Sequence, residues 1–176
     1  MMVHDKEFEV YISYESILER TQEIADKINL DYAGKNPVFI GILNGVFMFA
    51  ADLMKEIALP AEITFIKFAS YQNTTSTGNI KELIGLRSNI KDMDIIIIED
   101  IIDTGETIAH VIEKLQKLEP RSVEVATLLL KPEVFNKNIP LKYVGFEIPH
   151  KFVIGYGLDY NGQGRNLKDI YQIKEL

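Results

Sequence analysis

Four consecutive isoleucines at residues 95–98, bounded by Asp94 and Glu99, constrain the fold of this chain more than any other feature. Successive side chains of a strand point to opposite faces, so a strand made of these residues is apolar on both faces. β-branched side chains also favour strands over helices. A strand of this kind is typical of the centre of a parallel sheet that is covered on both faces. The segment therefore predicts an α/β fold.

Strand-like and helix-like segments alternate along the rest of the chain. We expect helices at residues 13–29, 47–56 and 108–118, and strands at residues 38–43, 63–69, 80–86, 95–98, 123–130, 143–148, 152–156 and 170–173. Ser16, followed three residues later by Glu19, fits a capping box at the start of the first helix. The alternation predicts a central, mostly parallel sheet flanked by helices, and 176 residues suffice for one domain.

The composition of the chain excludes several classes of partner and chemistry. The 26 acidic and 19 basic residues give a formal net charge of -7, and an acidic surface repels nucleic acid. The chain has no cysteine, which excludes disulfides, thiolate zinc sites and cysteine nucleophiles. It begins without a signal-peptide pattern, and no apolar run reaches the roughly 20 residues that a membrane-spanning helix needs. We therefore expect a cytoplasmic protein with no nucleic-acid or membrane partner.

The segment at residues 99–107, EDIIDTGET, lies between the isoleucine strand and the next helix. Ligands of open α/β sheets bind beyond the carboxyl ends of the strands, where this segment falls. Gly105 would let the backbone approach an anion closely, and Thr104 and Thr107 supply hydroxyl groups beside it. The free N–H groups at the start of the following helix also favour an anion. These features predict a phosphate site.

Three carboxylates in the same segment, those of Glu99, Asp100 and Asp103, would repel an anion that was bound alone. Carboxylates accept hydrogen bonds from hydroxyl groups and coordinate divalent cations, so a ligand with hydroxyls, phosphate and a bound cation would suit the segment. A simpler alternative stays open, in which the carboxylates are solvated and Asp103 begins an ordinary turn. Two other phosphate motifs, G-x-x-x-x-G-K-[ST] and G-x-G-x-x-G, do not occur in the chain.

The sequence IIIIEDIIDTGET at residues 95–107 resembles the signature of the purine phosphoribosyltransferases, in particular their hypoxanthine-guanine branch. The other matches are SYQN at residues 70–73, LLLKP around Lys131, VGFEIPHKFVIGYGLDYN at residues 144–161, and Arg165. All stand in the family's order. The resemblance implies a type I phosphoribosyltransferase fold in a single domain, residues 1–176. A small hood lobe would come from the chain ends, at about residues 1–15 and 145–176, and a flexible lid loop from about residues 70–80.

The resemblance also implies a reaction. Such an enzyme transfers the phosphoribosyl group of phosphoribosyl pyrophosphate to a 6-oxopurine, hypoxanthine or guanine, with Mg²⁺ as cofactor, and forms IMP or GMP and pyrophosphate. By position in the motif, Glu99 and Asp100 would face the ribose hydroxyls and Mg²⁺, and Asp103 would be the general acid/base beside purine N7. The residues around the 5′-phosphate would be Asp103, Thr104, Gly105, Glu106 and Thr107, with Glu106 contributing only its N–H.

Later residues would contact the base and the pyrophosphate, as the resemblance implies. Lys131 would donate to the exocyclic oxygen of a 6-oxopurine, Phe152 would stack on the base, and backbone groups near Val153 would read its edge. Asp159 would contact a second Mg²⁺, and Arg165 the pyrophosphate. Without the resemblance, Lys131 would be a solvent-exposed lysine at a strand end, because lysine is rarely buried unpaired. Phe152 would then be a core residue.

Leu43, Asn44 and Gly45 align with the family's pyrophosphate loop, and Ser70 and Tyr71 begin the lid that would exclude water from the reaction. Many members of the family carry lysine in place of Asn44. We expect the loop to bind through backbone N–H groups, which Gly45 helps to expose, so that asparagine is tolerated there. If the lysine charge is needed, this chain binds pyrophosphate more weakly.

Three alternatives keep the phosphate site but change the function. The base could be xanthine, which Lys131 and Phe152 do not exclude. The second alternative is a non-catalytic regulatory protein of the same family, which would sense phosphoribosyl pyrophosphate and bind RNA. Against it, the acidic chain lacks the basic face that RNA binding requires. The third is a phosphate-binding α/β domain without phosphoribosyl chemistry. The resemblance further implies a homodimer or homotetramer, for which the sequence identifies no interface.

Overall fold

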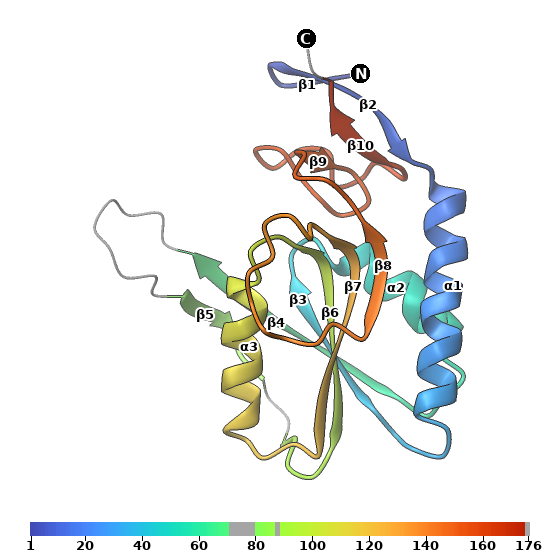
Figure 1. Ribbon diagram of the computed structural model, residues 1–176, viewed down its shortest axis with the longest axis vertical. Helices are drawn as coiled ribbons and strands as arrows, with labels where there is room; N and C mark the ends of the chain where they lie inside the picture. Colours follow the sequence, from blue (N-terminus) through green and yellow to red (C-terminus); the bar gives the residue numbers. More distant parts are fainter. Residues whose placement is uncertain (71–79, 87–88, 175–176) are drawn as a thin grey trace.

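The computed structural model describes residues 1–70, 80–86 and 89–174 (Figure 1). Its central sheet has the strand order β5-β4-β3-β6-β7-β8. These strands are β3 (Val38–Leu43), β4 (Glu62–Ser70), β5 (Ile80–Ile84), β6 (Asp94–Ile102), β7 (Ser122–Leu130) and β8 (Tyr143–Glu147). All pair in parallel except β5, which is antiparallel to β4 at one edge. The predicted α/β fold with a mostly parallel sheet is confirmed.

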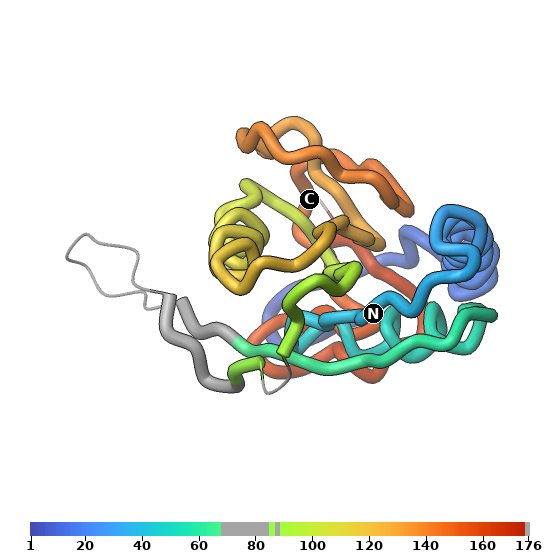
Figure 2. Tube along the Cα trace, turned by 90° about the horizontal axis from the view of Figure 1, so that it is seen from below, coloured from blue at the N-terminus to red at the C-terminus, as the bar shows by residue number. Residues whose placement is uncertain are grey.

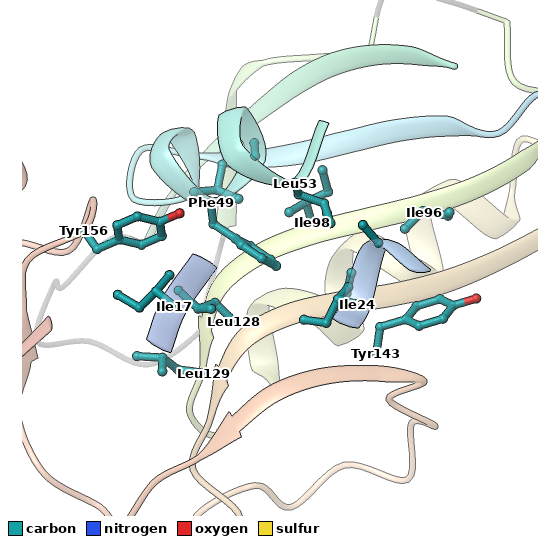
Figure 3. Packing of buried hydrophobic residues seen from close by; sticks show 14 of the residues in the cluster. Ile17, Ile24, Phe49, Leu53, Ile96, Ile98, Leu128, Leu129, Tyr143 and Tyr156 are labelled. Carbon is teal, nitrogen blue, oxygen red and sulfur yellow. The ribbon is translucent and has the colours of Figure 1, made fainter. Parts of the chain in front are cut away.

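The isoleucine segment lies in β6, between β3 and β7 in the middle of the sheet. All four side chains are fully buried. The first and third pack in the cluster that includes α3 (Glu106–Gln116), whereas Ile96 and Ile98 pack in the cluster that includes α1 (Tyr14–Asp31) and α2 (Phe47–Glu56) (Figure 3). Helices therefore cover both faces of the sheet, α1 and α2 on one side and α3 on the other (Figure 2).

The first helix begins close to the expected position, but its capping residue differs from the predicted one. The side chain of Ser13 caps α1 by accepting a hydrogen bond from the N–H of Ser16 at 3.2 Å. Ser16 lies inside the first turn, so the predicted capping box of Ser16 and Glu19 is wrong. Ser13 satisfies one of the free N–H groups of the helix, which a serine inside the helix cannot do in the same way.

The strand β6 is longer than the isoleucine segment and carries Glu99 and Asp100 within it. The sequence pattern alone predicts these residues in the loop beyond the strand. Pairing with β7 explains the difference, because Glu99 lies opposite Thr127 and Ile102 lies opposite Leu130. The loop thus begins only at Asp103, and the two carboxylates are held by the sheet itself.

A second, antiparallel sheet joins the two ends of the chain, and we call it the hood sheet (Figure 1). Its order is β1-β2-β10-β9, with β1 (Met2–Val3), β2 (Lys6–Ile12), β10 (Ile170–Ile173) and β9 (Val153–Ile154). This confirms a small lobe built from the chain ends. The strand expected at residues 152–156 is shorter because Gly155, Tyr156 and Gly157 all have positive φ angles, which turn the chain. In the described ranges, no helix could span a membrane.

Candidate active site

The carboxyl ends of β3, β6 and β7 meet at one edge of the central sheet (Figure 1). The turn after β6, residues 103–107, lines an open pocket of about 170 Å³, and we call it the 103–107 turn. The side chains of Asp103, Thr104, Glu106 and Thr107 are exposed there. Because pockets for whole small-molecule ligands are typically about 300–1,000 Å³, this one suits a single ligand group.

Gly105 lies at the centre of this turn, directly before α3, with a φ angle of 86°. A β-carbon at this position would lie 2.7 Å from Cε2 of Phe135 and 2.9 Å from Cγ of Lys137. Glycine is therefore needed both for the backbone conformation and for the close approach. It offers no side-chain cap to α3, and the N–H of Glu106 has only a long 3.5 Å contact with Thr104 Oγ1. The first turn of α3 can thus receive an anion.

Lys131 and Asp103 form an ion pair at the edge of this turn. The side chain of Lys131 is 7% exposed, and its ammonium lies 2.8 Å from Oδ1 of Asp103, which is 49% exposed. The N–H of Lys131 donates to the carbonyl oxygen of Ile102 at 3.0 Å, which fixes the two strand ends side by side. The alternative of a solvent-exposed Lys131 is wrong, since Asp103 provides the partner that a buried charge requires.

Glu99 and Asp100 are adjacent carboxylates at the end of β6, and Glu99 is only 7% exposed. Burial raises the pKa of Glu99 well above its usual range, and the negative charge of Asp100 raises it further. Burial also raises the pKa of Asp100, while hydrogen bonds and the charge of Arg165 oppose that rise. The pair therefore favours a shared proton or a cation over two free negative charges.

The loop after β3 reaches this carboxylate pair through glycine. The Leu43–Asn44 peptide bond is cis, the Asn44 side chain is exposed, and Gly45 is buried. A β-carbon on Gly45 would lie 1.6 Å from Oδ2 of Asp100, and one on Gly157 would lie 1.9 Å from the carbonyl oxygen of Gly45. The Gly45 loop therefore packs against Asp100, and the Gly157 segment packs against the Gly45 loop, because neither glycine carries a side chain at the contact.

Asp159 and Arg165 form a second ion pair, on the segment that joins β9 to β10. Arg165 Nη2 lies 2.6 Å from Oδ1 of Asp159, and Nη1 donates to the carbonyl oxygen of Gly157 at 2.7 Å. The other carboxylate oxygen of Asp159 accepts from the N–H of Gly162 at 2.7 Å. Arg165 thus brings a positive charge next to the loop that holds Gly45.

Phe152 precedes β9 and is 45% exposed, so the interpretation as a core residue is wrong. Its ring lies against Phe8, at 6.3 Å between centroids, and edge-to-face against Tyr160, at 5.6 Å. Val153 is buried in β9. These two contacts hold the ring in place, and its exposure leaves part of its surface open to a ligand.

The remaining predicted site residues are Leu43, which ends β3, and Ser70, which ends β4. Tyr71 and residues 72–79 of the expected lid lie outside the described residues. Two further residues at the site were not predicted from the sequence: Lys137, which forms an ion pair with Glu106, and Gly157. Lys137 is 31 residues from its partner, so no local pattern signals the contact.

The model of the phosphoribosyl transferase domain family matches residues 13–161 of the chain. The hypoxanthine-guanine phosphoribosyltransferase of Streptococcus agalactiae is 42% identical over 167 residues, which are 94% of this chain and 93% of that protein. The enzyme of the same name from Bacillus subtilis is 40% identical over 175 residues, 99% of this chain and 97% of that protein.

Solved structures agree with the sequence matches. A hypoxanthine-guanine phosphoribosyltransferase of Bacillus anthracis, with HEPES in its active site, has a TM-score of 0.91 at 37% identity and covers 97% of this chain and 100% of its own. A hypoxanthine phosphoribosyltransferase of Staphylococcus aureus has a TM-score of 0.89 at 42% identity, with 94% and 91% covered. Sequence and fold thus match over nearly the whole length. The chain belongs to the phosphoribosyltransferase family, in its hypoxanthine-guanine branch.

Proposed function

We propose that this chain is a purine salvage enzyme that transfers the phosphoribosyl group of phosphoribosyl pyrophosphate to hypoxanthine or guanine. The products are IMP or GMP and pyrophosphate. The observation that carries the proposal is the ion pair of buried Lys131 with Asp103 beside the 103–107 turn. The shared name of the relatives from Streptococcus agalactiae and Bacillus subtilis supports the same bases.

The ion pair suits two neighbouring polar atoms of a 6-oxopurine, the oxygen at position 6 and the nitrogen N7. An ammonium only donates, so Lys131 favours the oxygen at position 6 and disfavours the amino group of adenine. Asp103 is half exposed beside it and can exchange the proton at N7 as a general acid/base. The exposed ring of Phe152 would stack on the base, with backbone groups at Val153 reading its edge.

The rest of the site would hold the phosphoribosyl donor. N–H groups of the first turn of α3 and the hydroxyls of Thr104 and Thr107 suit the 5′-phosphate. Glu99 and Asp100 can accept from the ribose hydroxyls. The Gly45 loop and Arg165 would face the departing pyrophosphate, whose negative charge they stabilise. Catalysis then consists mainly of holding two reactants in one geometry while water is excluded.

Mg²⁺ fits the same carboxylates as a cofactor. Glu99 and Asp100 provide hard oxygen ligands. A cation beside them would stabilise their charged forms and so counteract the raised pKa of Glu99. Within the described ranges, no group of three His, Cys, Asp or Glu side chains could hold a metal by itself, so substrate oxygens would complete the coordination. Asp159 would serve a second ion. Bound Mg²⁺ supplies positive charge to the leaving pyrophosphate.

The proposal also includes the organisation of the molecule. Residues 1–176 would form a single phosphoribosyltransferase domain, with hood elements at about residues 1–15 and 145–176. A lid at about residues 70–80, from Ser70 and Tyr71 onward, would close over the site. Family resemblance supports a homodimer or homotetramer and a cytoplasmic location.

A product-resolved assay with four purines tests the base specificity. We expect IMP from hypoxanthine and GMP from guanine, with xanthine a poorer substrate and no product from adenine. A higher kcat/KM for xanthine than for either 6-oxopurine would favour the xanthine alternative. Activity confined to adenine would overturn the role of Lys131. Absence of turnover, with tight and salt-sensitive RNA binding, would favour the regulatory alternative.

Gly45→Ala is expected to raise the KM for phosphoribosyl pyrophosphate by about tenfold or more, since a methyl group that clashes with a neighbour forces local movement. The methyl group would overlap Oδ2 of Asp100 at 1.6 Å. Steady-state kinetics with varied phosphoribosyl pyrophosphate check this. Gly34→Ala is the control, because its β-carbon would meet no atom within 4 Å although its φ of 76° is also strained. Equal KM values for the two variants would refute the local explanation.

A further inference from the structure

The segment at residues 99–107 contains four carboxylates and no cationic side chain. Two lysines from the segment after β7 compensate two of these charges. Lys131 pairs with Asp103 at 2.8 Å, and Lys137 pairs with Glu106. The proposed function explains the first pair through the purine base. It leaves the second pair without a role, since Glu106 contributes only its N–H.

The backbone after β7 folds back over the 103–107 turn and fixes Lys137 there. The N–H of Asn136 donates to the carbonyl oxygen of Thr104 at 3.4 Å. Cγ of Lys137 lies 2.9 Å from the position that a β-carbon on Gly105 would take, so the lysine stem packs against the turn. The side chain is only 27% exposed. The ammonium is thus held at Glu106 and is not a free surface charge.

Glu106 is the first residue of α3, where two electrostatic effects oppose each other. An acidic side chain in the first turn is favoured by the positive end of the helix dipole. The same helix end offers its N–H groups to the 5′-phosphate, so an unpaired carboxylate would compete with the phosphate and repel it. A cation paired with Glu106 weakens both effects, and for a bound ligand this means that the repulsion of the 5′-phosphate is reduced.

We propose that Lys137 is a positioning residue that neutralises Glu106 at the 103–107 turn and so increases the affinity for the 5′-phosphate. This inference rests on the proposed function of the turn. The effect should fall on the phosphoribosyl donor and the nucleotide product and leave the free base unaffected, because the proposed base contacts are those of Lys131 and Phe152.

Calorimetric titration of IMP into four proteins tests the proposal: the wild type, Lys137→Met, Glu106→Gln and the double variant. Methionine keeps the stem that packs on Gly105. We expect Lys137→Met to weaken IMP binding by about three- to tenfold, an effect of one partly screened charge near a helix end. The KM for phosphoribosyl pyrophosphate should rise similarly, with the KM for hypoxanthine unchanged. Glu106→Gln in the Lys137→Met background should restore IMP binding to within about twofold of the wild type.

Lys117→Met is the matched control, because Lys117 pairs with exposed Glu113 at the other end of α3, at 2.7 Å. It should leave IMP binding unchanged. Unaltered binding in Lys137→Met would overturn the inference. So would a loss that persists in the double variant, since Lys137 would then act through packing or direct phosphate contact. Failure of the proposed function itself would appear in the wild type, as absence of IMP binding.

Discussion

Asp103→Asn is expected to lower kcat for IMP formation by about 10²- to 10⁴-fold, the range usual for a general acid/base. Asparagine keeps the size of the side chain but cannot take up or return the proton at N7. The Kd of IMP should stay within about threefold of the wild type, because a residue that acts only in the transition state changes kcat more than binding. Steady-state kinetics and calorimetry measure the two quantities.

The structure adds a second effect of this variant. The ammonium of Lys131 is buried and loses its charged partner, so the melting temperature should also fall. Asp31→Asn is the matched control, because Asp31 pairs with Lys142 at 3.0 Å far from the 103–107 turn. It should keep the wild-type kcat. Unchanged turnover in Asp103→Asn would remove Asp103 from the acid/base role.

Lys131→Met should lower kcat/KM for hypoxanthine by about 100-fold, since a site built to donate to a ligand oxygen loses that charged hydrogen bond. Most of the loss should lie in the KM for the base, with the KM for phosphoribosyl pyrophosphate nearly unchanged. The preference for hypoxanthine over adenine should fall as well, because the ammonium that disfavours the adenine amino group is gone. Product-resolved kinetics with both bases check these changes.

Methionine is apolar and close to lysine in length, so it suits the buried position and the fold should persist. Lys142→Met, the other half of the remote ion pair, is the control and should keep the wild-type specificity. A Lys131→Met variant with unchanged discrimination between hypoxanthine and adenine would contradict the role of Lys131. The ion pair with Asp103 would then serve the fold alone.

Much of the fold follows from patterns that are local in the sequence. The four isoleucines predict a strand covered on both faces, and β6 is such a strand. One boundary could not be predicted, because pairing with β7 extends β6 as far as Ile102. It depends on a partner strand whose position the local pattern does not contain. The expected start of the first helix near residue 13 agrees with the structure, although Ser13 caps it in place of Ser16.

Some parts of the candidate site were predicted from the sequence and others were not. The 103–107 turn was identified because glycine, hydroxyls and a helix start stand together in the sequence. Predictions from the type of a single residue were wrong. Residue type alone predicts a solvent-exposed Lys131 and a buried Phe152, whereas Lys131 is buried and Phe152 is 45% exposed. Lys137 gave no signal at all. Burial is a property of the neighbours that a residue meets in space, which its own type only suggests.

The sequence by itself determined that strands and helices alternate around a parallel sheet, and it predicted a phosphate site after the central strand. Both depend on periodicity and on turn residues within a few positions, where backbone geometry limits the choices. Only the tertiary structure decided which charges meet. Neighbouring parallel strands place Lys131 beside Asp103, the backbone after β7 brings Lys137 to Glu106, and Gly45 lets a distant loop contact Asp100. Electrostatic energies depend on these distances and on burial, and both exist only in the folded chain.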